Sequence, residues 1–126
     1  MREIKVLLDT NIMIGILKAH PPTIALLVTE QLEFNNCAIS QITRMELLSY
    51  PSLEVSEKEV IQSLLANLLV LKLDESVEQE AIAFRRAYNV KLPDAIIAAT
   101  AKVYRLRLLT FDQQLHTKFA AYITDR

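Results

Sequence analysis

The stretch that decides the fold is KVLLDTNIMIG, from Lys5 to Gly15. Its apolar run, Val6 to Leu8, ends in the acid Asp9, and apolar residues resume directly after Asn11. Asp is a poor strand residue and a good helix cap, so the stretch predicts a strand that turns into a helix at Asp9. The carboxyl end of a strand is also where parallel sheets bind ligands. Two roles are therefore open for Asp9, a helix cap and a ligand.

The composition indicates a globular protein with a substantial core. The 126 residues are 52% apolar, which is most simply one domain spanning residues 1–126. The chain has 14 Lys and Arg against 15 Asp and Glu. This balance argues against a protein that binds along nucleic acid by charge alone, but not against one that binds a short segment of it. The single cysteine, Cys37, excludes an internal disulfide and fits a reducing cytoplasm, the location we expect. No signal peptide and no apolar stretch of eighteen residues is evident, so we expect no membrane partner.

The order of apolar runs predicts an α/β sandwich with a mostly parallel central sheet of four to five strands. The predicted strands are Lys5–Leu8, Cys37–Ile39, Leu68–Leu73 and Leu106–Thr110, with a fifth edge strand near 122–124. The predicted helices run from Pro21-Pro22 to near Phe34, from Ser40 to Leu48, from capping boxes at Ser56–Glu59 and Ser76–Gln79, and from Asp94 to about Tyr104. The only glycine, Gly15, excludes a phosphate loop and a dinucleotide-binding loop, since each needs more than one.

Four acids, Asp9, Glu46, Asp94 and Asp112, lie after predicted strands or near the start of the helices that follow. Each has an ordinary structural role open to it: a cap, a favourable charge at a helix start, a turn or a solvated surface acid. As a group they are harder to explain, because two carboxylates about 5 Å apart repel by roughly 3 kcal/mol at an effective dielectric of 20. A divalent cation turns that repulsion into coordination, and oxygen ligands favour Mg²⁺ or Mn²⁺. We interpret the two histidines, His20 and His116, as surface residues.

Four motifs carry a resemblance to a known family: LLDTNIMIG at 7–15, SQITRMELLSY at 40–50, LPDAIIAATA at 92–101 and LLTFDQQL at 108–115. In these the chain resembles the PIN domains, the metal-dependent ribonuclease fold of the VapC-type toxins in toxin–antitoxin pairs. The resemblance implies a PIN-like α/β/α sandwich. It also implies that Asp9, Glu46, Asp94 and Asp112 match the family's acidic quartet, which binds one or two Mg²⁺ or Mn²⁺ ions.

The same resemblance implies supporting roles for five polar residues: Thr10, Asn11, Ser40, Thr43 and Thr110. Thr10 and Asn11 match the polar pair after the first acid, and Thr110 matches the hydroxyl near the last one. Ser40, Thr43 and Glu46 share one helical face by their spacing of three residues. Gln113 and Gln114 follow Asp112 where a further acid would strengthen a second metal site, so we expect that site to be weaker.

The predicted function is metal-assisted hydrolysis of RNA phosphodiester bonds. The resemblance implies a homodimer and a cognate antitoxin. The chain is also rich in apolar residues, which form either the core or a surface that binds a partner. They include Leu26, Leu27, Leu47, Leu48, Tyr50 and Leu53. Two interpretations are open for five cationic residues: they contact the RNA backbone, or they are solvated charges on the surface. These residues are Arg44, Lys91, Lys102, Arg105 and Arg107. The remaining alternative is a catalytically inactive PIN-like module that binds nucleic acid or protein.

Two other classes of protein are disfavoured because this chain lacks residues that each class requires. A phosphatase of the haloacid dehalogenase type needs a second Asp where this chain has Asn11. A response-regulator receiver needs an acidic pair at the first strand end and a phosphorylatable Asp near the third strand, where this chain has Leu8 and Leu53.

Overall fold

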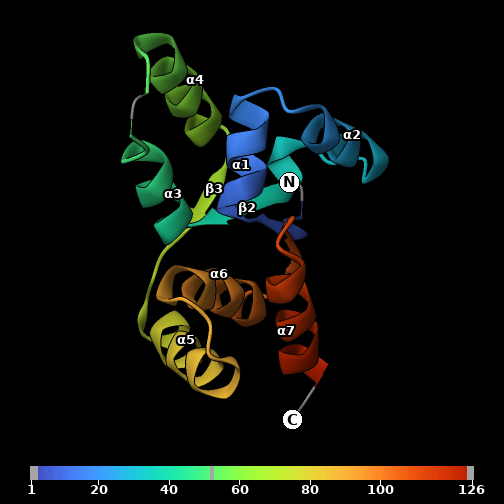
Figure 1. Cartoon of the computed structure of the whole chain (residues 1–126), viewed down its shortest axis with the longest axis vertical. Coiled ribbons are helices and arrows are strands. Elements are labelled where there is room, and N and C mark those ends of the chain that lie inside the picture. The colour runs from blue at the N-terminus through green and yellow to red at the C-terminus, as the bar shows by residue number, and fades with distance from the viewer. Residues whose placement is uncertain (1–2, 52, 125–126) are drawn as a thin grey trace.

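The computed structural model describes residues 3–51 and 53–124. Its sheet has four parallel strands in the order β3-β2-β1-β4, with crossover connections through helices (Figure 1). The strands are β1 (Val6–Leu8), β2 (Cys37–Ser40), β3 (Leu69–Leu71) and β4 (Arg107–Leu109). The four predicted strand runs are thus confirmed, each with bounds shifted by at most two residues. The sheet is wholly rather than mostly parallel within the described residues.

The central strands are apolar throughout because both faces of the sheet are covered. Val6 and Leu8 face one core cluster, whereas Leu7, between them, faces the other, as the two-residue period of a strand requires. All three side chains are at most 2% exposed. At the edge of the sheet, β3 is covered less completely, and its Leu69 is 48% exposed. Continuous apolar strands are therefore a consequence of the two helical layers.

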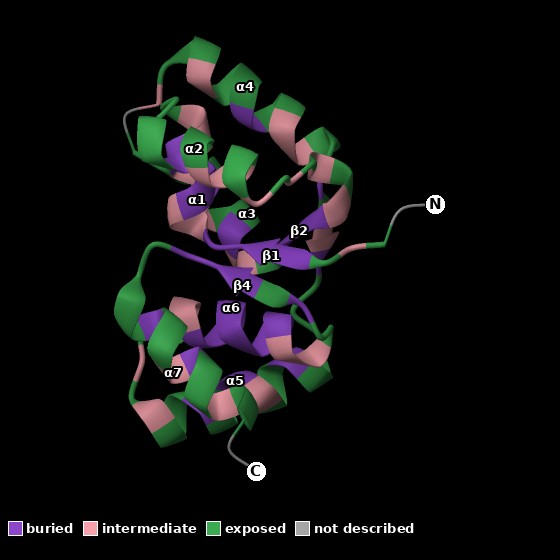
Figure 2. Ribbon diagram, turned by 90° about the vertical axis from the view of Figure 1, so that its right-hand side faces the viewer, coloured by how far each residue is buried: buried purple, intermediate pink, exposed green. Residues whose placement is uncertain are grey.

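One helical layer consists of α1 (Thr10–Leu17), α2 (Pro21–Thr29), α3 (Gln41–Leu48) and α4 (Val55–Ala66). A short 3₁₀ turn, η1 (Phe34–Asn36), precedes β2. The second layer consists of α5 (Glu75–Tyr88), α6 (Leu92–Val103) and α7 (Gln113–Thr124). Figures 1 and 2 show the two layers on opposite faces, with the buried residues concentrated along the sheet and the helix sides facing it. The architecture is an α/β/α sandwich.

The N-terminal caps of two helices lie two residues before the predicted ones, and α6 begins at Leu92 rather than at Asp94. The capping box of α4 is formed by Glu54 and Glu57 rather than by Ser56 and Glu59. The cap of α5 is Asp74, whose Oδ1 accepts the Val77 N–H at 3.0 Å, so the predicted box at Ser76 is wrong. In both cases an acid two residues earlier reaches the free amides of the first turn, and carboxylates cap at least as well as serine.

The predicted fifth strand near 122–124 is also wrong, because these residues form the last turn of α7. Leu115 and Phe119 are buried at a spacing of four, and Tyr122 continues that helical face. The Tyr122 ring packs against Phe84 and Tyr88 of α5, with ring centroids 4.9 and 5.9 Å apart. The apolar residues therefore follow a helical period, not strand alternation.

No single helix in the described part of the chain is long and apolar enough to cross a membrane. Only α1 and α2 taken together have the required length and composition, and the two are bent by 112° relative to each other. α1 is a core helix, with Ile12, Met13 and Gly15 buried.

Candidate functional site

The site lies at the carboxyl ends of β1 and β4, the two strands joined by the register Leu8 to Leu109. Asp9 follows β1 directly and is 4% exposed. Its backbone N–H donates to the Leu109 carbonyl at 2.9 Å, which extends the ladder by one residue. Asp112 lies at the start of α7, just after β4, and its Oδ1 accepts the Leu115 N–H at 3.1 Å. Both acids thus occupy the same edge of the sheet.

Each carboxylate oxygen of Asp9 accepts a hydrogen bond. Oδ1 accepts the Thr10 N–H at 2.7 Å, so Asp9 caps α1, as its position predicts. Oδ2 accepts the Thr110 hydroxyl at 2.6 Å, across 101 positions of the sequence. Two donors thus fix the orientation of the one acid that the fold buries almost completely.

The Thr110 hydroxyl joins three of the predicted site residues. Besides donating to Asp9, its Oγ1 accepts the Asp112 N–H at 3.0 Å and the Asn11 side-chain amide at 3.2 Å. The Asn11 carbonyl oxygen in turn accepts the Phe111 N–H at 3.3 Å. The loop that carries Asp112 is therefore tied to the start of α1 at two points.

A second hydroxyl network holds Glu46. The Thr10 hydroxyl donates to Glu46 Oε1 at 2.7 Å and lies 3.0 Å from Thr43 Oγ1. Thr43 is fully buried and Glu46 half-buried on the same face of α3, as their spacing of three predicts. Thr10 thus links the helix that starts at Asp9 to the helix that carries Glu46.

Ser40 has a different position from the other predicted residues. It caps α3 by accepting the Ile42 N–H at 3.3 Å, and its hydroxyl lies 3.4 Å from Thr100 Oγ1. These are its hydrogen-bond partners among the described residues, and neither is an acid. Its supporting role is therefore to set the start of α3, three residues before Thr43.

Asp94 occupies the third position of α6, after Leu92 and Pro93, and is half-buried. Burial raises the pKa of the Asp94 carboxyl, and the nearby charges of Asp9, Asp112 and Glu46 raise it further, against an opposing effect of Lys91. Burial likewise raises the pKa of Asp9, its two hydrogen bonds oppose this, and Glu46 and Asp112 add to it. The four acids thus act on one another electrostatically, although they come from four separate segments.

The donor chemistry of the site fits a hard divalent cation, because carboxylate and hydroxyl oxygens are the groups that Mg²⁺ and Mn²⁺ prefer. Among the described residues, no three Asp, Glu, His or Cys side chains are gathered as a ready coordination group. Hydrogen bonds hold Asp9 and Glu46 in place, and like charges at this edge repel one another. Both histidines are exposed, and His20 Nδ1 lies 2.9 Å from Thr23 Oγ1.

A polar hollow of about 270 Å³ lies beside two of the acids. Asp94, Asp112, Lys91 and Lys118 line it, together with the amides of Asn89 and Gln114 and with Val90 and Leu115. The sequence prediction included Lys91 but missed Lys118. The available signal is the helical spacing of four between Gln114 and Lys118, which places them on one side of α7.

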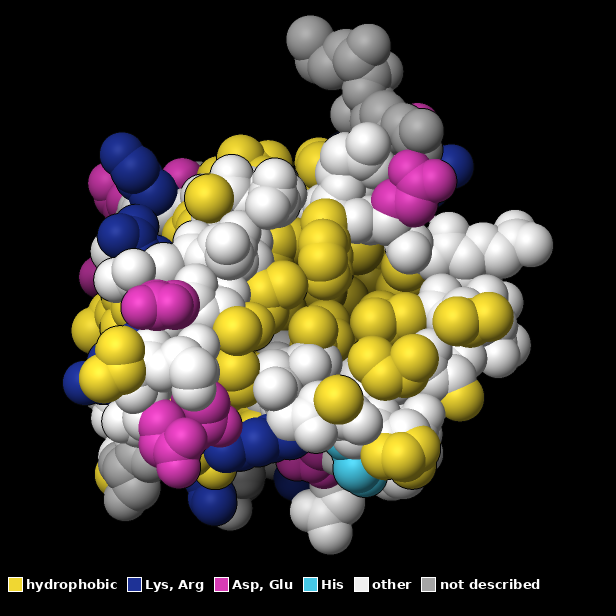
Figure 3. Space-filling view, turned by 90° about the horizontal axis from the view of Figure 1, so that it is seen from above, with side chains coloured by type: hydrophobic (Ala, Val, Ile, Leu, Met, Phe, Trp, Pro, Cys, Tyr) yellow, Lys and Arg dark blue, Asp and Glu magenta, His cyan; other side chains and the backbone are white. Residues whose placement is uncertain are grey.

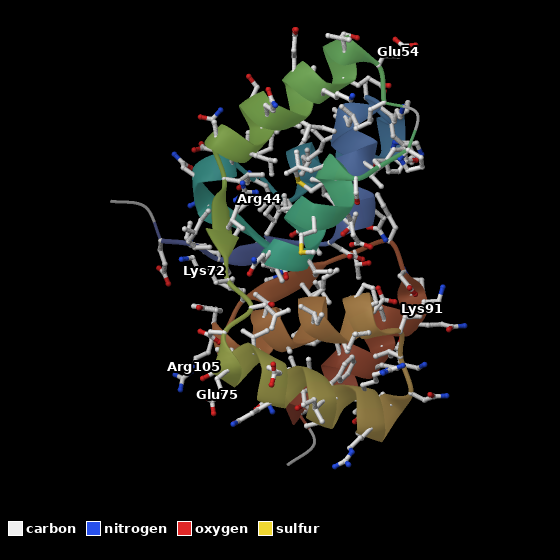
Figure 4. The ribbon with its side chains drawn as sticks, turned by 90° about the vertical axis from the view of Figure 1, so that its left-hand side faces the viewer. Arg44, Glu54, Lys72, Glu75, Lys91 and Arg105 are labelled. Atoms are coloured by element: carbon white, nitrogen blue, oxygen red, sulfur yellow. The ribbon has the colours of Figure 1, made fainter. Side chains whose placement is uncertain are left out.

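Most of the other cations considered from the sequence lie elsewhere. Lys102 pairs with Glu80 at 3.1 Å, and Arg107 pairs with Glu30 at 2.9 Å. Arg105 and Arg107 stand at the amino end of β4, opposite to the edge that carries Asp112. Figure 4 shows Arg105 and Lys91 on opposite sides of the molecule. Of that set, Lys91 is the one that lines the hollow beside the acids.

The parallel sheet and its two helical layers define an α/β/α domain that known structures share. A chain of a toxin–antitoxin complex from Klebsiella pneumoniae is 32% identical, with a TM-score of 0.73, over 84% of this chain and 85% of its own length. FitAcB from Neisseria gonorrhoeae is 26% identical, with a TM-score of 0.71, over 91% and 93%. VapBC-1 from nontypeable Haemophilus influenzae, at 24% identity and a TM-score of 0.74 over 93% of each chain, shares the fold.

The family model of the PIN domain matches residues 6–120. The chain belongs to the PIN domain family. No curated protein sequence matches it. The resemblance predicted from the four motifs is therefore confirmed for the family and for the α/β/α fold.

Proposed function

We propose that this protein is a metal-dependent ribonuclease that hydrolyses RNA phosphodiester bonds, and that it is the VapC-type toxin of a toxin–antitoxin pair. The observation that carries the proposal is the nearly complete burial of Asp9 at a sheet edge where Glu46 and Asp112 raise the cost of its charge. Membership of the PIN family supports a nuclease, and the similar chain from a toxin–antitoxin complex supports a toxin. A cytoplasmic location goes with the same proposal.

In this proposal Asp9, Glu46 and Asp94 hold Mg²⁺ or Mn²⁺, and Asp112 assists at the same ion or at a second one. When bound, the ion polarises the scissile phosphate and lowers the pKa of a water molecule for in-line attack. The chain supplies the preorganisation. Thr110 and the Thr10 N–H orient Asp9, and the Thr10 hydroxyl orients Glu46.

The hollow beside Asp94 and Asp112 is where we place the RNA backbone. Lys91 and Lys118 line it from two different elements, and each offers a positive charge to a phosphate. The acids alone would repel RNA, so lysines next to them are needed to neutralise phosphates near the cleaved bond. Contact with a short segment of RNA is consistent with a chain whose net charge is −1.

We further propose a cognate antitoxin and a homodimer. Figure 3, which looks onto the end of the molecule formed by α4, α1 and α2, shows hydrophobic side chains gathered around a hollow. Contiguous apolar surface of this kind marks protein interaction sites. Of the apolar residues considered from the sequence, Leu47 is core at 2% exposed, whereas Leu48 is 50% and Tyr50 37% exposed. Copurification with the product of a neighbouring gene, and the mass in solution, test the two partners.

Cleavage of single-stranded RNA in Mn²⁺ tests the nuclease. Asp9→Asn and Asp94→Asn should each lower the rate by more than about 100-fold, since even the outer partners of metal ligands are worth about 10- to 100-fold. Glu75→Gln is the matched control, because Glu75 is an exposed acid in the first turn of another helix, α5. Undiminished cleavage in both Asp variants would refute the assignment. RNA binding without cleavage by the wild type would favour the inactive module.

A further inference from the structure

An exposed aromatic residue lies in the segment that joins β4 to Asp112. Phe111 lies between Thr110 and Asp112 in the sequence and is 39% exposed, although its neighbour Thr110 is buried. The His20 ring, from the loop between α1 and α2, meets it at a centroid distance of 6.2 Å and an interplanar angle of 87°. Two aromatic side chains from segments 91 positions apart thus meet, and one of them belongs to the residue that precedes Asp112.

The His20 ring and the Phe111 backbone are anchored by hydrogen bonds. The Phe111 N–H donates to the Asn11 side-chain oxygen at 3.3 Å, and His20 Nδ1 lies 2.9 Å from Thr23 Oγ1. Thr23 is fully buried against Gly15, where any side chain on the glycine would collide with the threonine hydroxyl. A ring that is fixed before it binds a ligand loses little conformational entropy on binding.

The chain links Phe111 to the polar hollow, because the next residue, Asp112, lines it. Asp112 lines that hollow together with Lys91 and Lys118, and Phe111 is its immediate neighbour in the chain. An RNA strand with a phosphate between the lysines and the acids has a nucleotide next to it, and the base of that nucleotide needs a surface to lie on. Flat apolar rings are the surface that unpaired RNA bases use.

We propose that the Phe111 ring, with His20 set edge-to-face against it, is a stacking platform for one base of single-stranded RNA next to the cleaved phosphodiester. The proposal rests on the proposed function, since it names how the substrate of that site is held. Stacking on an aromatic ring tolerates any base, because every base has a π-face. The platform therefore contributes affinity and position rather than sequence choice.

The test uses a short single-stranded RNA that contains the fluorescent base 2-aminopurine, with Ca²⁺ in place of Mn²⁺. Binding to the wild type should quench the emission, because the base stacks on a ring. Phe111→Leu keeps an apolar side chain and should remove most of the quenching and weaken binding by about 5- to 100-fold. Phe111→Trp should preserve both. Tyr104→Leu is the matched control, because Tyr104 is 40% exposed at the far end of α6 from Asp94.

Cleavage kinetics in Mn²⁺ provide a second readout. Phe111→Leu and His20→Ala should raise KM with kcat within about twofold of the wild type, and the Mn²⁺-induced rise in Tm should be unchanged. A merely structural role for Phe111 would instead lower Tm and kcat together. Equal weakening by Phe111→Trp and Phe111→Leu would overturn the platform.

The two proposals fail in different ways. Quenching by a wild type that does not cleave RNA would refute the nuclease and keep the platform. Cleavage with the same KM in Phe111→Leu would refute the platform and keep the nuclease. Absence of quenching in the wild type overturns the platform whatever the cleavage assay gives, and leaves a protein partner as the ligand of the exposed rings.

Discussion

Replacing Asp94 with Asn removes one negative charge from the carboxyl edge of the sheet and leaves the size of the side chain almost unchanged. Among the described residues, none donates a hydrogen bond to the Asp94 carboxylate, so the change sacrifices no bond. Burial opposes its charge, as do Asp9, Asp112 and Glu46, whereas Lys91 favours it more weakly. The variant should therefore be more stable than the wild type in EDTA, although it has lost a residue of the site.

The magnitude follows from two opposing effects. At an effective dielectric of about 20, two carboxylates about 7 Å apart repel by about 2 kcal/mol, and solvent exposure and salt reduce this to about 0.5 kcal/mol for each pair. Relief from three such neighbours is set against the loss of an acid near a helix N-terminus, worth about 0.3–1 kcal/mol. The net gain is about 1 kcal/mol, or a rise in Tm of about 3–5 °C for a domain of this size.

Thermal unfolding followed by circular dichroism, at low salt in EDTA and then in Mn²⁺, measures both effects. In Mn²⁺ at about one hundred times its Kd the wild type should gain about 2.7 kcal/mol, and Asp94→Asn should gain much less. The raised pKa also sets a pH dependence. Repulsion is present when the pH is above that pKa and is lost as the carboxyl is protonated, so the stability difference in EDTA should close as the pH falls towards 3.9.

Glu75→Gln again serves as the control. Glu75 also lies in the first turn of a helix, and Figure 4 shows it far from Lys91, the neighbour of the acidic site. That variant should lose a few tenths of a kcal/mol and leave the Mn²⁺ effect unchanged. The electrostatic reasoning is refuted if Asp94→Asn lowers Tm in EDTA as Glu75→Gln does, or if Mn²⁺ stabilises it as much as the wild type.

Three further predictions concern the scaffold. Tyr122→Phe removes the hydroxyl that donates to Glu80 and should lower the free energy of unfolding by about 1–2 kcal/mol at pH 7. Because that bond lowers the pKa of Glu80, the loss is full above about pH 4.3 and shrinks as the pH falls through the lowered pKa, which urea unfolding at pH 7 and pH 3 will compare. Gly15→Ala places a methyl group against Thr23 and should cost about 1–3 kcal/mol by the same assay, with part recovered on adding Thr23→Ala. Burial raises the pKa of the Cys37 thiol to about 11, so a thiol reagent at pH 8 should label it only after urea unfolds the protein.

Much of the fold could be predicted because the signals are local. Val6, Leu7 and Leu8 alternate between the two faces of a sheet that is covered on both, and such a strand reads as an unbroken apolar run. Asp9 and Ser40 cap the helices that follow their strands, as short-range patterns indicate. The spacing of Ser56 and Glu59 predicted a capping box two residues after the one that Glu54 and Glu57 form, because both pairs have the same spacing of three.

The strand predicted near residues 122–124 is part of the last helix, α7, because tertiary packing decides the conformation of these residues. Residues 122–124 are apolar enough for a strand, and only the packing of Tyr122 on Phe84 and Tyr88 shows that they continue α7. A short apolar run at the end of an element has no period of its own. Its partner decides its conformation.

The sequence by itself determined the order of strands and helices as far as α6 and β4. It also identified four acids that follow strands or lie near helix starts. Each of these features depends on neighbours within a few residues. The tertiary structure decided which groups hold those acids. Thr110 reaches Asp9 across 101 positions, Thr10 reaches Glu46 across 36, and Phe111 meets His20 across 91. Such contacts depend on strand order and register, and these arise only when the two helical layers close over the sheet.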